Sequence, residues 1–321
     1  MSLPRRLLPL LLLAGVVLLA AGAAEARTRT ANVLVGIGDQ QAQMFANPLY
    51  RALGLRRTRY FVRWDAIDHP DALAKADAFV DAARDAHVQV LMHISTNDFE
   101  PERAHLPSVA AYRARVGALV ARYRNRGVRE WGVWNEANHR TQPTFDNPKR
   151  AAQFYLAMRA LCPGCRIVAL DLLYRLNIRP WLATWLKALP LRERNRTLTV
   201  GIHQYTDPNE HETTATRTTI RLVREQVRHT RFWLTETGGL AYVRLAGTQK
   251  VQRTCSLSRQ ATATTRAFSV ARVFDRDLER MYTYSWTGTD CTGFDAGLVN
   301  RDGSARPALK AFATALKGFR R

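Results

Sequence analysis

The 321-residue sequence has few acidic residues, few cysteines and, beyond its first 26 residues, no hydrophobic run long enough to cross a membrane. Only 27 Asp and Glu oppose 48 Lys and Arg, which gives a formal net charge of +21. No linker, low-complexity tract or short repeat interrupts the chain after its N-terminal segment. These absences argue against a multi-pass membrane protein or a chain of small modules and favour a single large domain over residues 27–321.

The first 26 residues have the pattern of a secretory signal peptide. Arg5 and Arg6 precede an apolar run over 7–20, and Ala-Glu-Ala follows at 24–26. This order of positive, apolar and small residues predicts cleavage after Ala26 and export. A retained membrane anchor is the alternative, but the apolar run is short for a span of ~20 residues. We therefore expect a secreted or cell-envelope protein with no membrane span after cleavage.

The four cysteines are an even number in a chain expected to be exported, which predicts disulfides. Cys162 and Cys165 could instead form half of a zinc site or a redox pair. A zinc site would need a second close pair, whereas Cys255 and Cys291 are far apart in sequence. We expect one bridge between Cys162 and Cys165 and another between Cys255 and Cys291, and we expect no metal or other cofactor.

The positive charge admits an anionic partner, such as an acidic polysaccharide, a charged envelope or a nucleic acid. The arginines are dispersed along the chain and do not form one block. Steering of an anionic ligand needs a clustered patch, so composition alone is the favoured explanation. We expect a carbohydrate ligand, with acidic polysaccharide as one candidate, no nucleic-acid partner, and a monomer.

Short apolar runs alternate with amphipathic runs along the chain. This alternation predicts an α/β fold, a (β/α)8 barrel, which typically takes ~250 residues. An open doubly wound sheet is the alternative, but Gly36-Ile37-Gly38 is too short for a phosphate-binding glycine loop. The predicted strands are Asn32–Ile37, Thr58–Trp64, Val88–Ile94, Glu130–Trp134, Arg166–Leu170, Leu198–Gln204, Arg231–Thr235 and Met281–Ser285. The predicted helices are Asn47–Leu53, Asp71–Ala86, Pro107–Tyr123, Pro148–Leu161, Pro180–Leu189, Thr216–His229, Ser258–Asp277 and Pro307–Leu316.

Two glutamates follow predicted barrel strands. Trp134-Asn135-Glu136 ends the fourth strand and Thr235-Glu236 ends the seventh. Barrel enzymes carry their catalytic groups at the C-terminal ends of the strands. A pair of carboxylates at this end suits glycosidic cleavage, in which one acts as an acid and the other attacks the sugar or activates water. A lone glutamate at a strand end is more often structural, so the prediction depends on the pair.

These residues resemble clan A of the glycoside hydrolases, the 4/7 barrel superfamily. The resemblance implies a retaining enzyme that cleaves β-type bonds by double displacement, with Glu136 as acid/base and Glu236 as nucleophile. It also implies that Asn135 contacts the sugar 2-hydroxyl. In one respect the chain departs from many members, because Ala137 stands where proline is common. The other positions that carry the resemblance are Arg63, expected to hold the nucleophile, His203 and Tyr205 of a His-x-Tyr motif whose tyrosine bonds the nucleophile, Trp286 as the floor of the −1 sugar site, and the tail over 297–308.

Two other function classes stay open from the sequence. A barrel that binds glycans without cleaving them would keep the fold, and a basic binder of the envelope or of nucleic acid would need a continuous arginine patch. The loop over 240–256 is the longest and could cover the cleft, Glu210-His211-Glu212 suggests a solvated turn more than a metal site, and His93 suggests a core histidine. Up to half of the polar strand-end residues Asp39, Asn97, Asp98, His139, Asp171, Tyr174 and Asp290 are expected to contact sugars.

Overall fold

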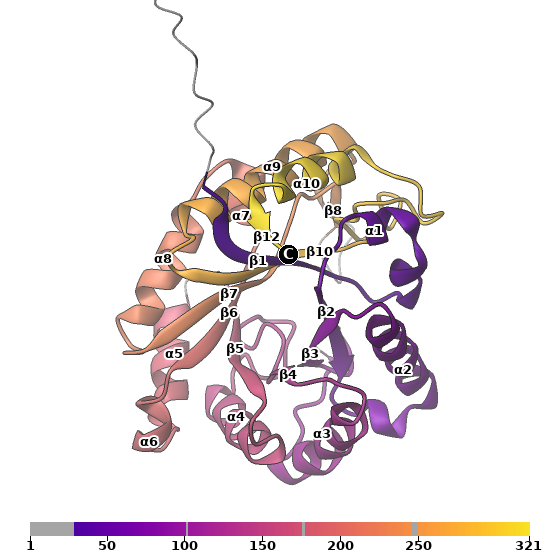
Figure 1. Cartoon of the computed structure of the whole chain (residues 1–321). Helices are drawn as coiled ribbons and strands as arrows, with labels where there is room; N and C mark the ends of the chain where they lie inside the picture. The colour runs from indigo at the N-terminus through magenta and orange to yellow at the C-terminus, as the bar shows by residue number, and fades with distance from the viewer. Residues whose placement is uncertain (1–28, 101, 175–176, 245–249) are drawn as a thin grey trace, which may run out of the picture.

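A closed parallel barrel forms the centre of the protein (Figure 1). The computed structural model describes residues 29–100, 102–174, 177–244 and 250–321, so the predicted signal peptide lies outside the described residues. Each barrel strand pairs in parallel with the next, and the last pairs with the first. The predicted barrel is confirmed, and the open-sheet alternative is wrong. The barrel strands are β1 (Ala31–Gly38), β2 (Arg57–Arg63), β3 (Gln89–Ser95), β4 (Glu130–Gly132), β5 (Arg166–Leu173), β6 (Leu198–Gln204), β7 (Thr230–Thr237) and β10 (Leu278–Tyr284).

Helices surround the barrel and separate its strands in sequence (Figure 1). Several begin with proline in the first turn, where a missing N–H breaks no helical hydrogen bond. Ser108 and Ser256 cap two others through their side-chain oxygens. The main helices are α1 (Pro48–Ala52), α2 (Pro70–Asp85), α3 (Val109–Arg124), α4 (Pro148–Leu161), α5 (Ile178–Lys187), α8 (Thr214–Arg224), α9 (Leu257–Val273) and α10 (Pro307–Leu316). Shorter pieces are η1 (Ala42–Ala46), η2 (Ala66–Asp68), α6 (Leu191–Arg194) and α7 (Thr206–Glu210).

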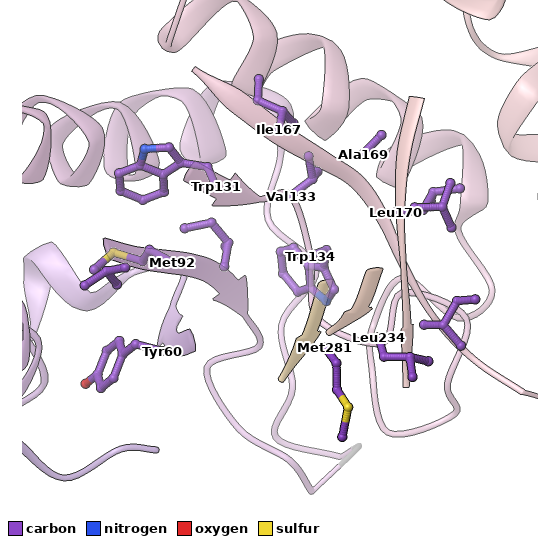
Figure 2. Close-up of a cluster of buried hydrophobic side chains, with 14 of the residues drawn as sticks. Tyr60, Met92, Trp131, Val133, Trp134, Ile167, Ala169, Leu170, Leu234 and Met281 are labelled. Carbon is purple, nitrogen blue, oxygen red and sulfur yellow. The ribbon is translucent and has the colours of Figure 1, made fainter. Parts of the chain in front are cut away.

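Alternation along the strands divides the buried side chains into two sets. One set packs between strands and helices, including Met92, Trp131 and Leu234 in Figure 2. The other set fills the barrel itself, where Leu91, Val168, Trp233 and Tyr282 form a separate cluster. Successive residues of a strand point to opposite faces, so Met92 and Leu234 face the helices while their neighbours Leu91 and Trp233 face the barrel axis.

Three short strands outside the barrel were not predicted. They are β8 (Tyr242–Arg244) and β9 (Val251–Arg253), in the loop after β7, and β11 (Phe294–Asp295), in the loop after β10. Together they form an antiparallel sheet. A Cys255–Cys291 disulfide joins these two loops, and Cys162–Cys165 forms the second bridge, with Cα atoms 5.5 and 5.4 Å apart. The pairs are those that the sequence predicts. A further strand, β12 (Phe319–Arg320), pairs with β1.

Within the part of the chain that the structure describes, no helix is both long and apolar enough to cross a bilayer.

Candidate active site

Glu136 and Glu236 lie at the same mouth of the barrel, one hundred positions apart in sequence. Nδ1 of His203 is 2.9 Å from Oε1 of Glu136 and 3.6 Å from Oε2 of Glu236. The two glutamate side chains are 19% and 11% exposed, so both reach solvent. Glu136 has a φ of 47°, a left-handed conformation that L residues seldom adopt and that clusters at functional sites. The two carboxylates can therefore act on one ligand.

Two neighbours fix the Glu236 carboxylate. Arg59 Nη1 donates to Oε2 at 2.8 Å, and the hydroxyl of Tyr205 donates to Oε1 at 2.7 Å. Each carboxylate oxygen thus has one donor, which holds the side chain in a single orientation. The Arg59 guanidinium in this ion pair is almost fully buried, which shields the contact from solvent.

The arginine at Glu236 is Arg59, and the predicted contact with Arg63 is wrong. Arg63 pairs with Asp65, Nε to Oδ1 at 2.5 Å, and its side chain is 30% exposed. Both arginines are on β2 and differ by four positions, so alternation directs them to the same face. At about 3.3 Å per residue, Arg63 lies roughly 13 Å further along the strand, at the rim and out of reach of the carboxylate.

A buried network supports the two glutamates from below. Asp171 lies 2.8 Å from Nε2 of His203 and accepts a hydrogen bond from Arg59 Nη2 at 3.2 Å. The same Arg59 nitrogen donates to Oδ1 of Asn135 at 2.5 Å. Asp171 is fully buried, so it orients His203 and Arg59 and does not contact a sugar as the sequence suggested. His93 receives a hydrogen bond from Arg59 Nε at 3.0 Å, in agreement with a core role.

The network determines the charges at the site. Burial would lower the pKa of His203, but the charges of Asp171 and Glu236 and hydrogen bonds to Asp171 and Glu136 raise it to about 10. Burial would raise the pKa of Glu136, but the hydrogen bond and positive charge of His203 lower it below its ordinary value. Burial lowers the pKa of His93 to about 3, so this imidazole is neutral. Near neutral pH, a His203 imidazolium therefore lies between two carboxylates.

This charge state predicts a pH-dependent stability. The folded-state pKa of His203, about 10, exceeds the ordinary histidine value of 6.5. Its contribution is thus complete below pH 6.5 and disappears as the pH rises through 10, with a slope of at most about 1.4 kcal/mol per pH unit. We expect urea unfolding between pH 7 and 9.5 to show a shallower decline in His203→Asn than in the parent. His211→Asn, at an exposed position, is the matched control, and parallel curves for His203→Asn and the parent would contradict the assignment.

Trp286, the predicted floor of the −1 sugar site, is largely buried but lines a hollow of about 840 Å³ at the barrel mouth, so this role stays a prediction. Trp286 lies two residues beyond β10, is 2% exposed and packs edge-to-face on Tyr50 at 5.4 Å. Tyr284, the last residue of β10, is only partly buried. It lies close enough to Glu236 for the carboxylate charge to reinforce burial in raising the tyrosine pKa. Tyr284 is therefore an aromatic residue near Glu236 that the sequence did not single out.

The remaining strand-end residues have mixed positions. Nδ1 of His139 is 3.6 Å from Glu136, so it borders the site. Asp39 is buried and accepts backbone hydrogen bonds from Gln40, Gln41 and Thr287, and burial raises its pKa to about 6. Asp98 and Asp290 form ion pairs with Arg103 and Arg301, Asn97 hydrogen-bonds its own loop, and Tyr174 packs against the core.

The Glu210-His211-Glu212 segment has no sign of a metal site. Glu210 forms an ion pair with Arg253, and Glu212 is exposed. Among the described residues, no group of three or more His, Cys, Asp or Glu side chains is arranged to hold a metal ion.

Comparison with known proteins supports the fold. No known family and no curated protein matches the sequence. Similar solved structures include a glucosidase from Croceicoccus marinus, with a TM-score of 0.66, 16% identity, and coverage of 90% of this chain and 68% of the other. The chain has the barrel fold of these glycosidases. A GH10 endoxylanase from a sugarcane soil metagenome (TM-score 0.62, 13% identity, coverage 88% and 97%) and a fungal β-1,4-galactanase (0.63, 14%, 87% and 98%) are also similar. At these identities the likeness concerns the fold alone, and the family is not assigned.

Proposed function

We propose that this chain is a secreted retaining glycoside hydrolase that cleaves β-type O-glycosidic bonds of an oligosaccharide or polysaccharide, with residues 27–321 as one catalytic barrel. The observation that carries the proposal is the approach of Glu136 and Glu236 to one atom, Nδ1 of His203. Retaining enzymes need carboxyl groups only ~5 to 5.5 Å apart, whereas inverting enzymes need ~6.5 to 9.5 Å to admit a water. The short distances to His203 favour the retaining spacing.

In the first step Glu236 attacks the anomeric carbon. A bond forms between a carboxylate oxygen and this carbon while the bond to the leaving oxygen breaks, and Glu136 transfers its proton to that oxygen. Arg59 and Tyr205 hold Glu236 for the attack. In the second step Glu136 removes a proton from water, which displaces Glu236 and restores the configuration of the sugar.

Glu136 must carry a proton in the first step, and His203 opposes this in the free protein by lowering the glutamate pKa. A bound sugar covers the exposed part of Glu136 and removes water, which favours the neutral acid. Attack by Glu236 removes a negative charge, so Glu136 is then free to become the charged base. The His203 imidazolium thus favours the charged Glu136 that the second step needs. Substrate binding favours the protonated Glu136 that the first step needs.

The function is tested by product stereochemistry. Similar solved structures include a xylanase, a galactanase and a glucosidase, so the first panel is xylan, β-1,4-galactan and aryl β-glucosides. We expect NMR to show the β-anomer as the initial product of a cleaved substrate, because two displacements retain configuration. Initial release of the α-anomer would exclude double displacement, and a failure to cleave a broad panel of glycans would exclude the hydrolase.

A further inference from the structure

A row of five aromatic side chains runs along the barrel mouth from the side of Glu236. Ring centroids are 5.1 Å apart from Tyr205 to Phe294, 6.4 Å from Phe294 to Tyr284, 6.1 Å from Tyr284 to Phe61, and 5.9 Å from Phe61 to Phe99. The rings come from five separate segments: the ends of β6 and β10, strands β2 and β11, and the loop after β3. The fold thus brings residues from across the sequence into one continuous series of neighbouring rings.

Packing alone does not account for this row. None of its five members is fully buried, and Phe99 and Phe294 are 43% and 38% exposed. Only six large hydrophobic residues are exposed in the described part of the chain, and these two are among them. Exposed aromatic area forgoes the stabilisation that burial would give, and grouped exposed apolar side chains mark ligand or partner sites.

Two hollows lie along the row. Phe61 and Phe99 line one of about 450 Å³, beside Arg63 and Asn97. Tyr284 and Phe294 line another of about 840 Å³. Amide side chains also line this larger hollow, and they can donate to and accept from hydroxyl groups: Gln40, Gln41, Gln43, Asn47 and Asn300. Flat apolar rings beside neutral hydrogen-bonding groups suit a sugar, which presents apolar C–H faces and hydroxyl edges.

The two hollows and the five aromatic residues along them are together called the groove. The charged side chains that line it balance one another, although the chain carries +21. In the smaller hollow Arg63 pairs with Asp65, and Lys75 lies one helical turn from Asp71 on α2. Asp39, Arg301 and Asp302 line the larger hollow, and Arg301 also forms an ion pair with Asp290 at 3.3 Å. The residues that line the two hollows thus carry no surplus of cations to select an acidic sugar.

We infer that this groove binds several consecutive sugars of an uncharged glycan chain on the glycone side of the cleaved bond; this rests on the proposed function. Glu136 protonates the leaving oxygen, so the leaving group lies on the side of Glu136. The row begins at Tyr205, which bonds Glu236, and so follows the part of the chain that becomes bound to the enzyme. Room for several sugars there means that the enzyme cleaves within chains, and it favours a neutral substrate over an acidic polysaccharide.

The test measures binding to the full mature chain carrying Glu236→Gln, so that hydrolysis does not consume the probe. The probes are xylohexaose, cellohexaose, β-1,4-galactohexaose and the charged hexagalacturonate, titrated by calorimetry. We expect a neutral hexasaccharide to bind and Phe99→Ala to weaken its affinity about three- to tenfold, because one stacking ring is lost. Phe99→Trp keeps a ring and should retain the affinity. Leu191→Ala, at a 68% exposed position on α6, is the matched control and should change nothing.

The groove assignment falls if no neutral hexasaccharide binds, if Phe99→Ala and Phe61→Ala both bind as tightly as the parent, or if hexagalacturonate binds more tightly than every neutral probe. The hydrolase proposal is judged separately with Glu236 intact. Binding that depends on Phe99 without any turnover would exclude hydrolysis and keep the glycan groove. If the protein hydrolyses aryl glycosides but hexasaccharide affinity does not change in Phe99→Ala and Phe61→Ala, the hydrolase proposal stands and the groove assignment is wrong.

Discussion

Replacing Glu236 with glutamine is expected to lower kcat on an aryl β-glycoside by at least about 10⁴-fold, the scale on which enzymes lose rate when their nucleophile is removed. Glutamine keeps the shape of the side chain and can still accept from Tyr205, but its neutral amide cannot form the glycosyl ester. The measurement is steady-state release of the aryl alcohol, with circular dichroism to verify that the variant is folded.

Glu212→Gln makes the same chemical change at an exposed loop position and should leave the rate unchanged. A second variant, Glu236→Gly, opens space for azide beside the anomeric carbon. Azide would then attack once, from the face that Glu236 normally occupies, and give an α-glycosyl azide. Wild-type rates in Glu236→Gln, or a β-glycosyl azide from Glu236→Gly, would exclude Glu236 as the nucleophile.

The barrel could be predicted from the sequence because each of its units is local. A short apolar strand and an amphipathic helix leave their patterns in consecutive residues, and prolines at 48, 70, 148 and 307 mark helix starts. The two disulfides could also be predicted from the sequence, because four cysteines with one close pair leave few reasonable pairings. Positions at strand ends then led to Glu136 and Glu236, which the structure brings together.

The sequence does not predict at which level along the barrel axis each residue of a strand lies. Arg59 and Arg63 have the same parity on β2, so alternation directs both to the same face and cannot tell which one reaches Glu236. Only the register between strands decides it. The pairing of β2 with β3 places Arg59 opposite Leu91 and Arg63 opposite Ser95, so Arg59 lies at the inner level and Arg63 at the outer end.

The aromatic residue beside the site was missed through a shift in a strand end. The sequence predicts the eighth barrel strand over Met281–Ser285, whereas β10 ends at Tyr284. Trp286 lies two residues beyond the end of β10, where strand alternation no longer fixes which face a side chain occupies. Phe294 was missed for another reason, because β11 forms only by pairing with β8 about fifty residues away. Such pairing leaves no periodic pattern in a two-residue strand.

Arg59 should therefore matter far more than Arg63 for both stability and activity. Arg59→Met leaves the buried carboxylates of Asp171 and Glu236 without their guanidinium, and removing one member of a buried charge pair costs about 3–5 kcal/mol. Arg63→Met breaks a pair that is partly exposed, and such pairs contribute about 0–1 kcal/mol. Urea unfolding of the two variants measures the difference, and both are matched in residue type, strand and face.

Lysine variants at the same two positions test which arginine supports Glu236. Arg59→Lys should keep the charge but lose the simultaneous contacts with Glu236, Asn135 and His93, because an ammonium group lacks the planar fork of donors. We expect its kcat to fall by at least about tenfold while Arg63→Lys stays near the parent. A greater loss in the Arg63 variants than in the Arg59 variants would restore the prediction made from the sequence. It would also mean that Arg63, at the outer end of β2, and not Arg59, inside the barrel, positions the carboxylates at the barrel mouth.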